Sequence, residues 1–285
     1  MSGLKGFVCP YSGKDIPFEH CTDKCEVHCM SQPLLLSLIS DRTEVSDVFH
    51  VTELATPEQI VYLKRTNDYF VHPFNLIWAV LGSAVHTIIE GQRDKVSIER
   101  YVIENPFVVD FGYAKVRGRA DIYDKESFIL YDYKTMKGYK AKRLLAGEWK
   151  DEPYMWQMNF YKKLAFPEAK VLMIEAIIKD WSRAMQDSDN LHPVERIEVP
   201  ILSEAKVEAQ LQEWLHKHVT NLSGDTKPIK CKQSDVWYNT NPRSKNCGVP
   251  LRCRDYCEVN SMCQQYRDYL DGVNDAERAR VYPKR

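Results

Sequence analysis

Residues Gly118 to Thr135 read GRADIYDKESFILYDYKT and place two carboxylates and a lysine on one predicted β-hairpin. The polar residues 124–127 separate two runs rich in β-branched and aromatic residues, which is typical of two antiparallel strands joined by a short loop. Because side chains alternate between the faces of a strand, Asp132 and Lys134 point the same way. Folding the hairpin back brings Asp121 near the same region.

This arrangement favours metal-dependent phosphodiester chemistry. Carboxylate oxygens hold hard divalent cations, and such a cation can clamp a phosphate and supply hydroxide near neutral pH. The lysine could orient the water or stabilise the developing negative charge. An isolated Asp-x-Lys is more often a solvated surface pair, so the rest of the chain has to decide.

Two helical patterns flank the hairpin. Upstream, LGSAVHTIIEG spaces Gly82, His86 and Glu90 four residues apart, so that they share one helical face, and the small glycine would allow a neighbouring element to approach. Downstream, WQMNFYKKL places Gln157 and Tyr161 on one face by the same spacing. Each pattern alone is ordinary, because a single helical histidine is more often a packed core residue than a ligand.

In this order and spacing, the motifs resemble the RecB-like branch of the PD-(D/E)XK nuclease superfamily over Val51 to Asp180. The resemblance implies an α/β core in which helices flank a mixed sheet. The ligands that it implies for Mg²⁺ or Mn²⁺ are the side chains of His86, Asp121 and Asp132 and the carbonyl of Tyr133.

The same resemblance implies roles for three further residues. Lys134 would be the catalytic lysine. Gln157 and Tyr161 would lie on a helix beside the site and contact DNA or brace the metal shell. The chain departs from the family in one respect, since Asp132 stands where many relatives have Glu.

Composition fits this class of protein. The chain has 285 residues, of which 44% are hydrophobic and 28% charged, as in ordinary globular proteins. We expect no membrane association, because no apolar run approaches a transmembrane helix in length and the start, MSGLKGFVCPYSGK, lacks the apolar core of a secretion signal. The expected location is the cytoplasm, or the host cytoplasm if the protein is phage-encoded.

A formal net charge of −1 means that any affinity for DNA must come from a local patch. The segment KTMKGYKAKR follows the catalytic strand and supplies the candidate DNA-binding residues Lys137, Lys140, Lys142 and Arg143. Nearby, Tyr139, Trp149 and Trp156 could stack on unpaired bases. The alternative is a solvated loop with core aromatic residues.

Nine cysteines in a reducing compartment indicate metal ligands rather than disulfides, and all nine lie near the two ends of the chain. The C-terminal triplet Cys253-x3-Cys257-x5-Cys263 is close to the one that RecB-like nucleases of the iron-sulfur type use to hold a [4Fe-4S] cluster. In those relatives the first gap is shorter by one residue and the fourth ligand is a distant N-terminal cysteine. Here we favour Cys231 as the fourth ligand, with Cys247 or an N-terminal cysteine as alternatives.

The N-terminal group lies in CPYSGKDIPFEHCTDKCEVHC and predicts a zinc knuckle. Its ligands would be Cys9, Cys21, Cys25 and Cys29, with His20 and His28 as substitutes. A closed tetrahedral site of this kind would stabilise a segment that has no core of its own. The alternative is that one of these cysteines completes the iron-sulfur site and the others are free.

The remaining pattern predicts helices at 33–39, 56–64, 72–91 and 203–219, and a buried strand at 170–179. We expect an N-terminal cysteine-rich segment, a nuclease core and a C-terminal iron-sulfur segment, at 1–50, 51–225 and 226–285.

The expected function is that of a metal-dependent DNA nuclease, a single-strand exonuclease of phage or prokaryotic recombination, repair or CRISPR adaptation. DNA and proteins of those pathways would be its partners. The alternative is a non-catalytic DNA-binding or assembly subunit, which would have no need of the complete set His86, Asp121, Asp132 and Lys134. A purely structural metal protein would leave the hairpin acids unexplained.

Overall fold

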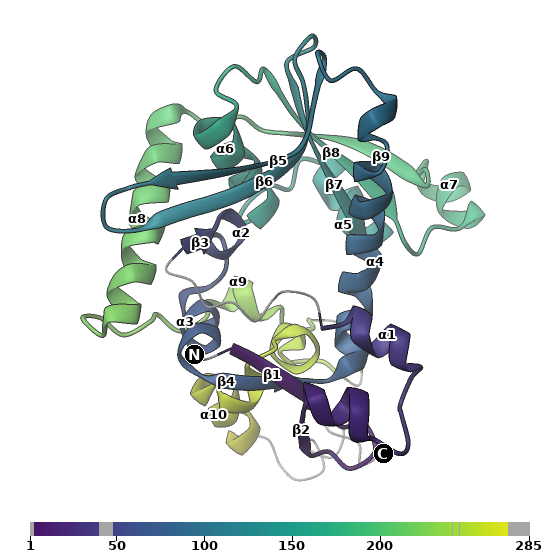
Figure 1. Cartoon of the computed structure of the whole chain (residues 1–285), viewed down its shortest axis with the longest axis vertical. Coiled ribbons are helices and arrows are strands. Elements are labelled where there is room, and N and C mark those ends of the chain that lie inside the picture. Colours follow the sequence, from purple (N-terminus) through teal and green to yellow (C-terminus); the bar gives the residue numbers. More distant parts are fainter. Residues whose placement is uncertain (1–2, 40–47, 241, 245, 273–285) are drawn as a thin grey trace. The chain divides into compact units, whose positions relative to one another are not determined.

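The computed structural model describes residues 3–39, 48–240, 242–244 and 246–272, which form two compact units (Figure 1). Unit 1 contains the described parts of Met1–Ser46, Thr56–Val80 and Lys217–Arg285, and unit 2 contains those of Asp47–Ala55 and Leu81–His216. Each unit is described by itself. The division at 1–50, 51–225 and 226–285 stays a prediction.

Unit 2 is built on a six-stranded mixed sheet, which confirms the expected α/β class. Its strands follow the order β3-β6-β7-β8-β9, and β5 pairs with β6. The pairs β3–β6 and β7–β8 are parallel, whereas β5–β6, β6–β7 and β8–β9 are antiparallel. The strand bounds are β3 Val48–His50, β5 Tyr101–Asp110, β6 Lys115–Asp124, β7 Ile129–Met136, β8 Val171–Ile178 and β9 Val194–Val199.

The predicted hairpin is present as β6 and β7. Its loop is closed by Asp124, whose Oδ1 accepts the backbone N–H groups of Glu126 at 3.0 Å and Ser127 at 3.3 Å. The same carboxylate forms a bidentate pair with Arg100 at 3.1 and 2.7 Å. Acidic side chains commonly close turns in this way. Both arms of the hairpin are therefore held at the loop, away from the candidate acids.

One face of the unit 2 sheet is covered by helices. Leu130 and Asp132 on β7 lie opposite Leu172 and Ile174 on β8, and all four side chains are buried. Helices α5 and α6 pack on this face, and α8 packs on α6 through a ring contact of 5.3 Å between Trp156 and Trp214. The helices of this unit are α2 Val51–Leu54, α5 Gly138–Leu145, α6 Pro153–Ala165 and α7 Arg183–Asp189, with the larger parts of α4 Pro73–Glu90 and α8 Glu204–Ser223 and a turn at Arg93–Lys95.

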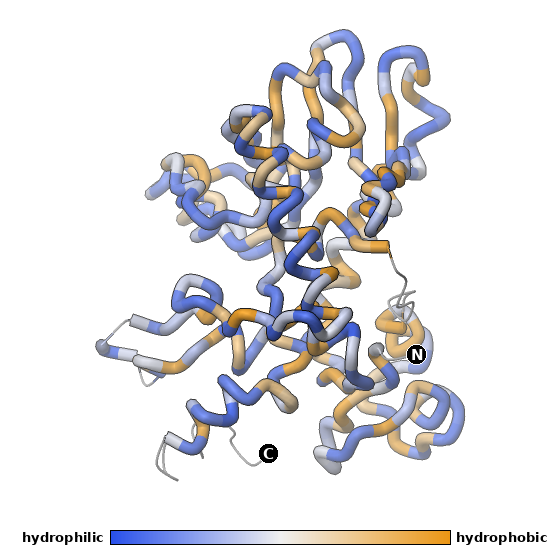
Figure 2. Tube along the Cα trace, turned by 90° about the vertical axis from the view of Figure 1, so that its left-hand side faces the viewer, coloured by the Kyte–Doolittle hydropathy of each residue, from blue (hydrophilic) through white to orange (hydrophobic). Residues whose placement is uncertain are grey.

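Unit 1 contains a three-stranded sheet and all nine cysteines. Strand β1 (Gly3–Val8) pairs in parallel with β4 (Asp68–Val71) and antiparallel with β2 (Asp15–Pro17). Its small core is Leu4, Phe7, Leu35, Leu38, Ile60, Tyr69, Val71, Leu76 and Val259. The helices are α1 Gln32–Ser37, α3 Glu58–Thr66, α9 Gln233–Val236 and α10 Gln264–Gly272, with short turns at His20–Lys24, Arg252–Tyr256 and Asn260–Met262. Figure 2 shows hydrophobic stretches in both units.

Helix α4 (Pro73–Glu90) corrects one expectation from the sequence. No Asp, Glu, Lys or Arg lies between Asp68 and Glu90, and the helical region Pro73–Lys95 is long and apolar enough to cross a membrane by length and composition alone. An apolar run of this length does therefore exist in the chain. It carries His86, whose contacts are polar.

The two glycines of the sequence motifs differ in how tightly they are packed. A Cβ at Gly118 would lie 2.5 Å from the ring of Phe107 and 2.8 Å from that of Tyr161. A Cβ at Gly82 would lie 3.8 Å from Thr135 Oγ1, which is ordinary contact, so close approach does not require a glycine there.

Gly118→Ala should therefore lower the free energy of unfolding by about 1–3 kcal/mol, the usual cost of overpacking. Gly82→Ala is the matched control and should raise the free energy of unfolding by up to about 1 kcal/mol, since alanine is the better helix former. Denaturant unfolding followed by circular dichroism measures both. Equal stability of the two variants would contradict the packing described for Gly118.

Candidate active site

The β6–β7 ladder ends where the candidate acids begin. Its paired positions run from Asp124 and Ile129 to Ile122 and Tyr131. The next residue of β6 is Asp121, whose Oδ2 accepts the backbone N–H of Tyr133 at 2.6 Å. The carboxylate thus replaces a ladder hydrogen bond, and this fixes its orientation between the separating strands.

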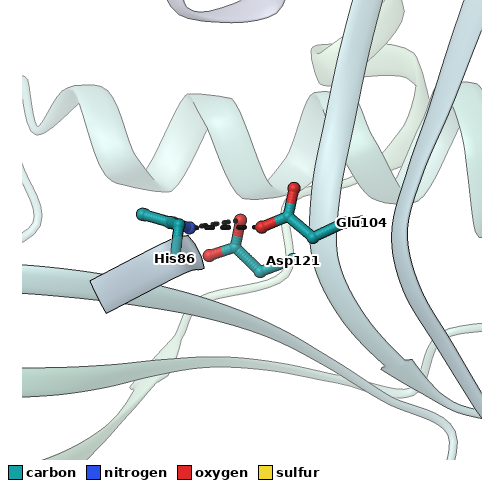
Figure 3. Close-up of side chains that lie close together, drawn as sticks. All are labelled: His86, Glu104 and Asp121. Carbon is teal, nitrogen blue, oxygen red and sulfur yellow. Dashed lines mark hydrogen bonds and ion pairs between the residues drawn. The ribbon is translucent and has the colours of Figure 1, made fainter. Parts of the chain in front are cut away.

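Three side chains converge at this point. His86 Nδ1 from α4 lies 3.3 Å from Asp121 Oδ1 and 3.3 Å from Glu104 Oε1 on β5, and Figure 3 shows the three groups pointing toward one another. Glu104 is buried and pairs through Oε2 with Arg119 Nε at 2.7 Å.

The sequence analysis missed Glu104. In β5, Ile103 pairs with Ile122 and Asn105 with Ala120, so Glu104 occupies the position opposite Asp121. Its φ of 47° turns it out of regular strand geometry. The one signal in the sequence was a single acidic residue inside the apolar strand YVIENPFVV.

Asp132 and Lys134 lie on one face of β7, as predicted. Asp132 is 1% exposed, and its Oδ2 lies 2.6 Å from Lys134 Nζ. Its Oδ1 accepts a hydrogen bond of 3.0 Å from Gln157 Nε2, and Gln157 also donates to the hydroxyl of Tyr161 at 3.3 Å. The structure therefore brings His86, Asp121, Asp132, Lys134, Gln157 and Tyr161 into one neighbourhood.

The protonation states follow from burial and charge. Hydrogen bonds to Asp121 and Glu104 raise the pKa of His86 to about 10, so the ring is cationic at neutral pH in the absence of metal. Burial raises the pKa of Asp132 to about 6. For Lys134, burial opposes the charge, but the attraction of Asp132 and Asp121 outweighs it and raises the pKa. Lys134 is consequently an ammonium at neutral pH, suited to stabilising negative charge rather than accepting a proton.

The residues present fit a divalent cation. One nitrogen of His86 and one oxygen each of Glu104 and Asp121 lie within 4.8 Å of one another. Carboxylate oxygens suit Mg²⁺ and Mn²⁺. Among the described residues, this is the group of three possible ligands whose atoms lie this close together. It contains the predicted His86 and Asp121 and, in addition, Glu104. The predicted ligand Asp132 instead pairs with Lys134.

The predicted DNA-binding residues lie on and just before α5, which is a helix rather than a loop. Three of them pair with carboxylates: Lys140 with Glu152 at 3.0 Å, Lys142 with Asp189 at 2.9 Å and Arg143 with Glu148 at 2.7 Å. Lys137 is exposed.

The three aromatic residues proposed to stack on bases differ in exposure. Tyr139 is 72% exposed, whereas Trp149 is buried, so stacking on bases by Trp149 is excluded. Trp156 packs against Phe160 and Trp214. Trp156 is half-buried, so Tyr139 is the most exposed of the three.

The cysteines of unit 1 line two separate cavities. The first is lined by Cys231, Cys253, Cys257 and Cys263, and Gln59 Nε2 donates a 3.1 Å hydrogen bond to the sulfur of Cys263. The second is lined by Cys9, Cys21, Cys25 and Cys29 together with His28. Cys247 is exposed and lines neither. Of the alternatives for the fourth C-terminal ligand, Cys231 is the one that lies with the triplet.

A model of the PD-(D/E)XK nuclease superfamily matches residues 78–264. The solved structure of SSO0001 is 16% identical, with a TM-score of 0.47 over 82% of this chain and 94% of that one. A phage-related exonuclease from Haemophilus somnus 129PT is 10% identical, with a TM-score of 0.33 over 50% and 70%. No curated protein matches the chain.

Replacing Glu104 by Gln should lower the pKa of His86, because one of the two carboxylates that hold the imidazolium is lost. In metal-free protein, the raised pKa of His86 contributes stability that is complete below its ordinary value of 6.5 and is lost as the pH rises through about 10. The stability of Glu104→Gln should therefore fall less over this pH range, because the pKa of its His86 is raised less. NMR titration of the ring protons measures the pKa, with Glu90→Gln on the same helix as the control. An unchanged titration of His86 would rule out its pairing with Glu104.

Proposed function

We propose that this chain, which belongs to the PD-(D/E)XK nuclease superfamily, is a Mg²⁺- or Mn²⁺-dependent deoxyribonuclease that degrades single-stranded DNA from an end. One observation carries the proposal. The registers of β5–β6 and β6–β7, the latter extended by one residue, place Glu104, Asp121 and Asp132 at neighbouring positions on three adjacent strands, and His86 and Lys134 contact these acids. So many ionisable groups in one buried neighbourhood are typical of a catalytic site.

His86, Asp121 and Glu104 would hold the metal, with Asp132 beside them. When bound, Mg²⁺ or Mn²⁺ supplies a clamp for the scissile phosphate and a water of lowered pKa. The proton on His86 must leave when its ring nitrogen becomes a ligand, so metal binding should strengthen as the pH rises.

Lys134 would stabilise the negative charge that develops on the phosphate. Its ammonium, held 2.6 Å from Asp132, is charged at neutral pH and needs no reorganisation during the reaction. Gln157 holds the other oxygen of Asp132, and Tyr161 is held in turn by Gln157. Because both helical side chains are buried, we assign them to bracing the site rather than to contact with DNA.

The single-strand preference rests on the segment after β7. Lys137 follows directly on the strand that carries Asp132 and Lys134, and Tyr139 two residues later is exposed. A cation beside an accessible aromatic ring suits a phosphate followed by an unpaired base. DNA recombination, repair or CRISPR adaptation would use such an activity, in keeping with the family resemblance.

We further propose a [4Fe-4S] cluster held by Cys231, Cys253, Cys257 and Cys263. Burial raises the pKa of Cys231 and Cys253 to about 12, so these thiols become thiolates only if a cationic group joins them. The N–H group that Gln59 points at Cys263 would stabilise such a thiolate.

Asp132→Asn should reduce cleavage of end-labelled single-stranded DNA about a hundredfold or more, because the carboxylate that faces Lys134 loses its charge. The amide keeps the shape of the side chain. Asp110→Asn, at the exposed end of β5, is the control and should leave the rate unchanged. Assays with and without Mn²⁺ measure both. Parental activity in a contaminant-free preparation of Asp132→Asn would refute the proposed site.

Lys137→Ala should weaken binding of single-stranded DNA and reduce the slope of log affinity against log salt concentration by about 0.7, the value for one lost phosphate contact. Lys142→Ala is the matched control, because its ammonium is already paired with Asp189. Fluorescence anisotropy without divalent metal measures both slopes. If Lys142→Ala reduces the salt slope and Lys137→Ala does not, the proposed phosphate contact of Lys137 is wrong.

Protein purified without oxygen should be brown and contain iron and acid-labile sulfide, because thiolate-bound clusters absorb visible light and zinc does not. Cys231→Ser and Cys257→Ser should lose the colour and the iron, whereas Cys247→Ser should keep them, since Cys247 is exposed outside the cavity. A colourless parent protein, purified with iron supplied, would contradict the iron-sulfur cluster. If Cys247→Ser loses iron and Cys231→Ser keeps it, the fourth ligand is Cys247 rather than Cys231.

A further inference from the structure

The second cysteine cavity is independent of the first and of the nuclease site. It is lined by four thiols and one imidazole from the first 29 residues: Cys9, Cys21, Cys25, Cys29 and His28. No three of these ligand atoms lie within 4.8 Å of one another, so the side chains would have to close around an ion. The predicted substitute His20 does not line it. None of the C-terminal cysteines contributes to this cavity, and none of these five residues contributes to the cavity of Cys231.

The turn that follows Cys9 is closed by backbone hydrogen bonds. Gly13 N–H donates to the carbonyl of Cys9 and Cys9 N–H to that of Lys14, both at 2.8 Å, and Gly13 adopts a φ of +67° that closes the turn. The turn fixes the backbone that presents Cys9 to the cavity, which this thiol lines together with the three other N-terminal thiols.

The segment from Cys9 to Leu34 has almost no core of its own. Among these residues Thr22 is buried and every other side chain is partly or fully exposed. Phe18 contacts Phe7 of the unit 1 core at 4.9 Å between ring centroids, and Cys21 and Cys29 pack against the same core. So little apolar burial does not fix a segment of this length, and a metal that cross-links it would.

We propose that Cys9, Cys21, Cys25 and Cys29 bind one Zn²⁺ that fixes residues 9–34 on the unit 1 core, as a site separate from the iron-sulfur cavity. Four sulfur ligands suit either zinc or an iron-sulfur cluster. Zinc is favoured because solvent reaches the site: Tyr11 and Val27, which line it, are each 68% exposed. Zinc has no redox chemistry to protect from solvent and oxygen, and it also accepts the imidazole that lies in the cavity.

Zinc, iron and acid-labile sulfide measured on the full chain purified without oxygen test the proposal. The parent protein should contain about one zinc per chain. Cys25→Ser should lose the zinc and keep iron and colour, whereas Cys257→Ser should lose iron and keep zinc. The exposed Cys247→Ser is the matched control and should keep the metal content of the parent.

A zinc-free parent protein overturns the proposal, as does loss of iron in Cys25→Ser with zinc retained, which would assign the N-terminal thiols to the cluster. If Cys25→Ser does not fold, the parent protein answers the question by limited proteolysis. Removal of zinc with a chelator should expose new cleavage sites within residues 9–34, and added Zn²⁺ should protect them again. Identical cleavage before and after chelation would overturn the site. Nuclease activity enters none of these measurements.

Discussion

Three carboxylates on adjacent strands impose the main constraint on unit 2. Glu104 faces Asp121 across β5 and β6, and extension of the β6–β7 register places Asp121 opposite Asp132. Like charges in facing positions repel, and burial removes the water that would screen them. Each acid accordingly has a cation at 3.3 Å or less: Arg119 for Glu104, His86 for Asp121 and Lys134 for Asp132. A divalent ion would relieve the same repulsion, so the arrangement that is costly without metal is also one that could hold such an ion.

The topology of the sheet explains why this cluster can form. Strand β6 pairs with β3 at residues 115–117 and with β7 at 122–124, and β5 runs along its other edge. Between the β3 and β7 ladders, on the edge of β6 opposite β5, residues 118–121 have no partner among the described strands. The gap leaves room for the ring of Tyr161 over Gly118 and for the carboxylate of Asp121. An interruption in backbone pairing thus creates the space in which the polar side chains meet.

Patterns local in sequence predicted much of this, whereas pairings between distant segments were not predictable. The hairpin, strand β8 and helix α8 each carry a complete periodic signal, and the structure has them within a few residues. Glu104 was not predicted, because the sequence of a strand that contains a single acidic residue shows neither which residue it faces on the next strand nor that its φ is positive. The basic segment was interpreted as a free patch because the acids that pair with it follow it in the sequence: Glu148 and Glu152 come shortly after the segment, and Asp189 comes much later.

Unit 1 depends on a different kind of stabilisation from unit 2. Among its described residues, one core cluster has nine buried side chains from β1, α1, α3, β4, α4 and the C-terminal segment, and Cys21, Cys29, Cys231 and Cys257 pack against that cluster. A core this small supplies limited free energy, and metal sites commonly make up the difference in small domains. Both cysteine cavities adjoin this core, but their linings share no residue, so a ligand lost from one leaves the thiols of the other in place. A metal in either cavity would add to the packing of unit 1, whereas the acid cluster of unit 2 is held by its own ion pairs.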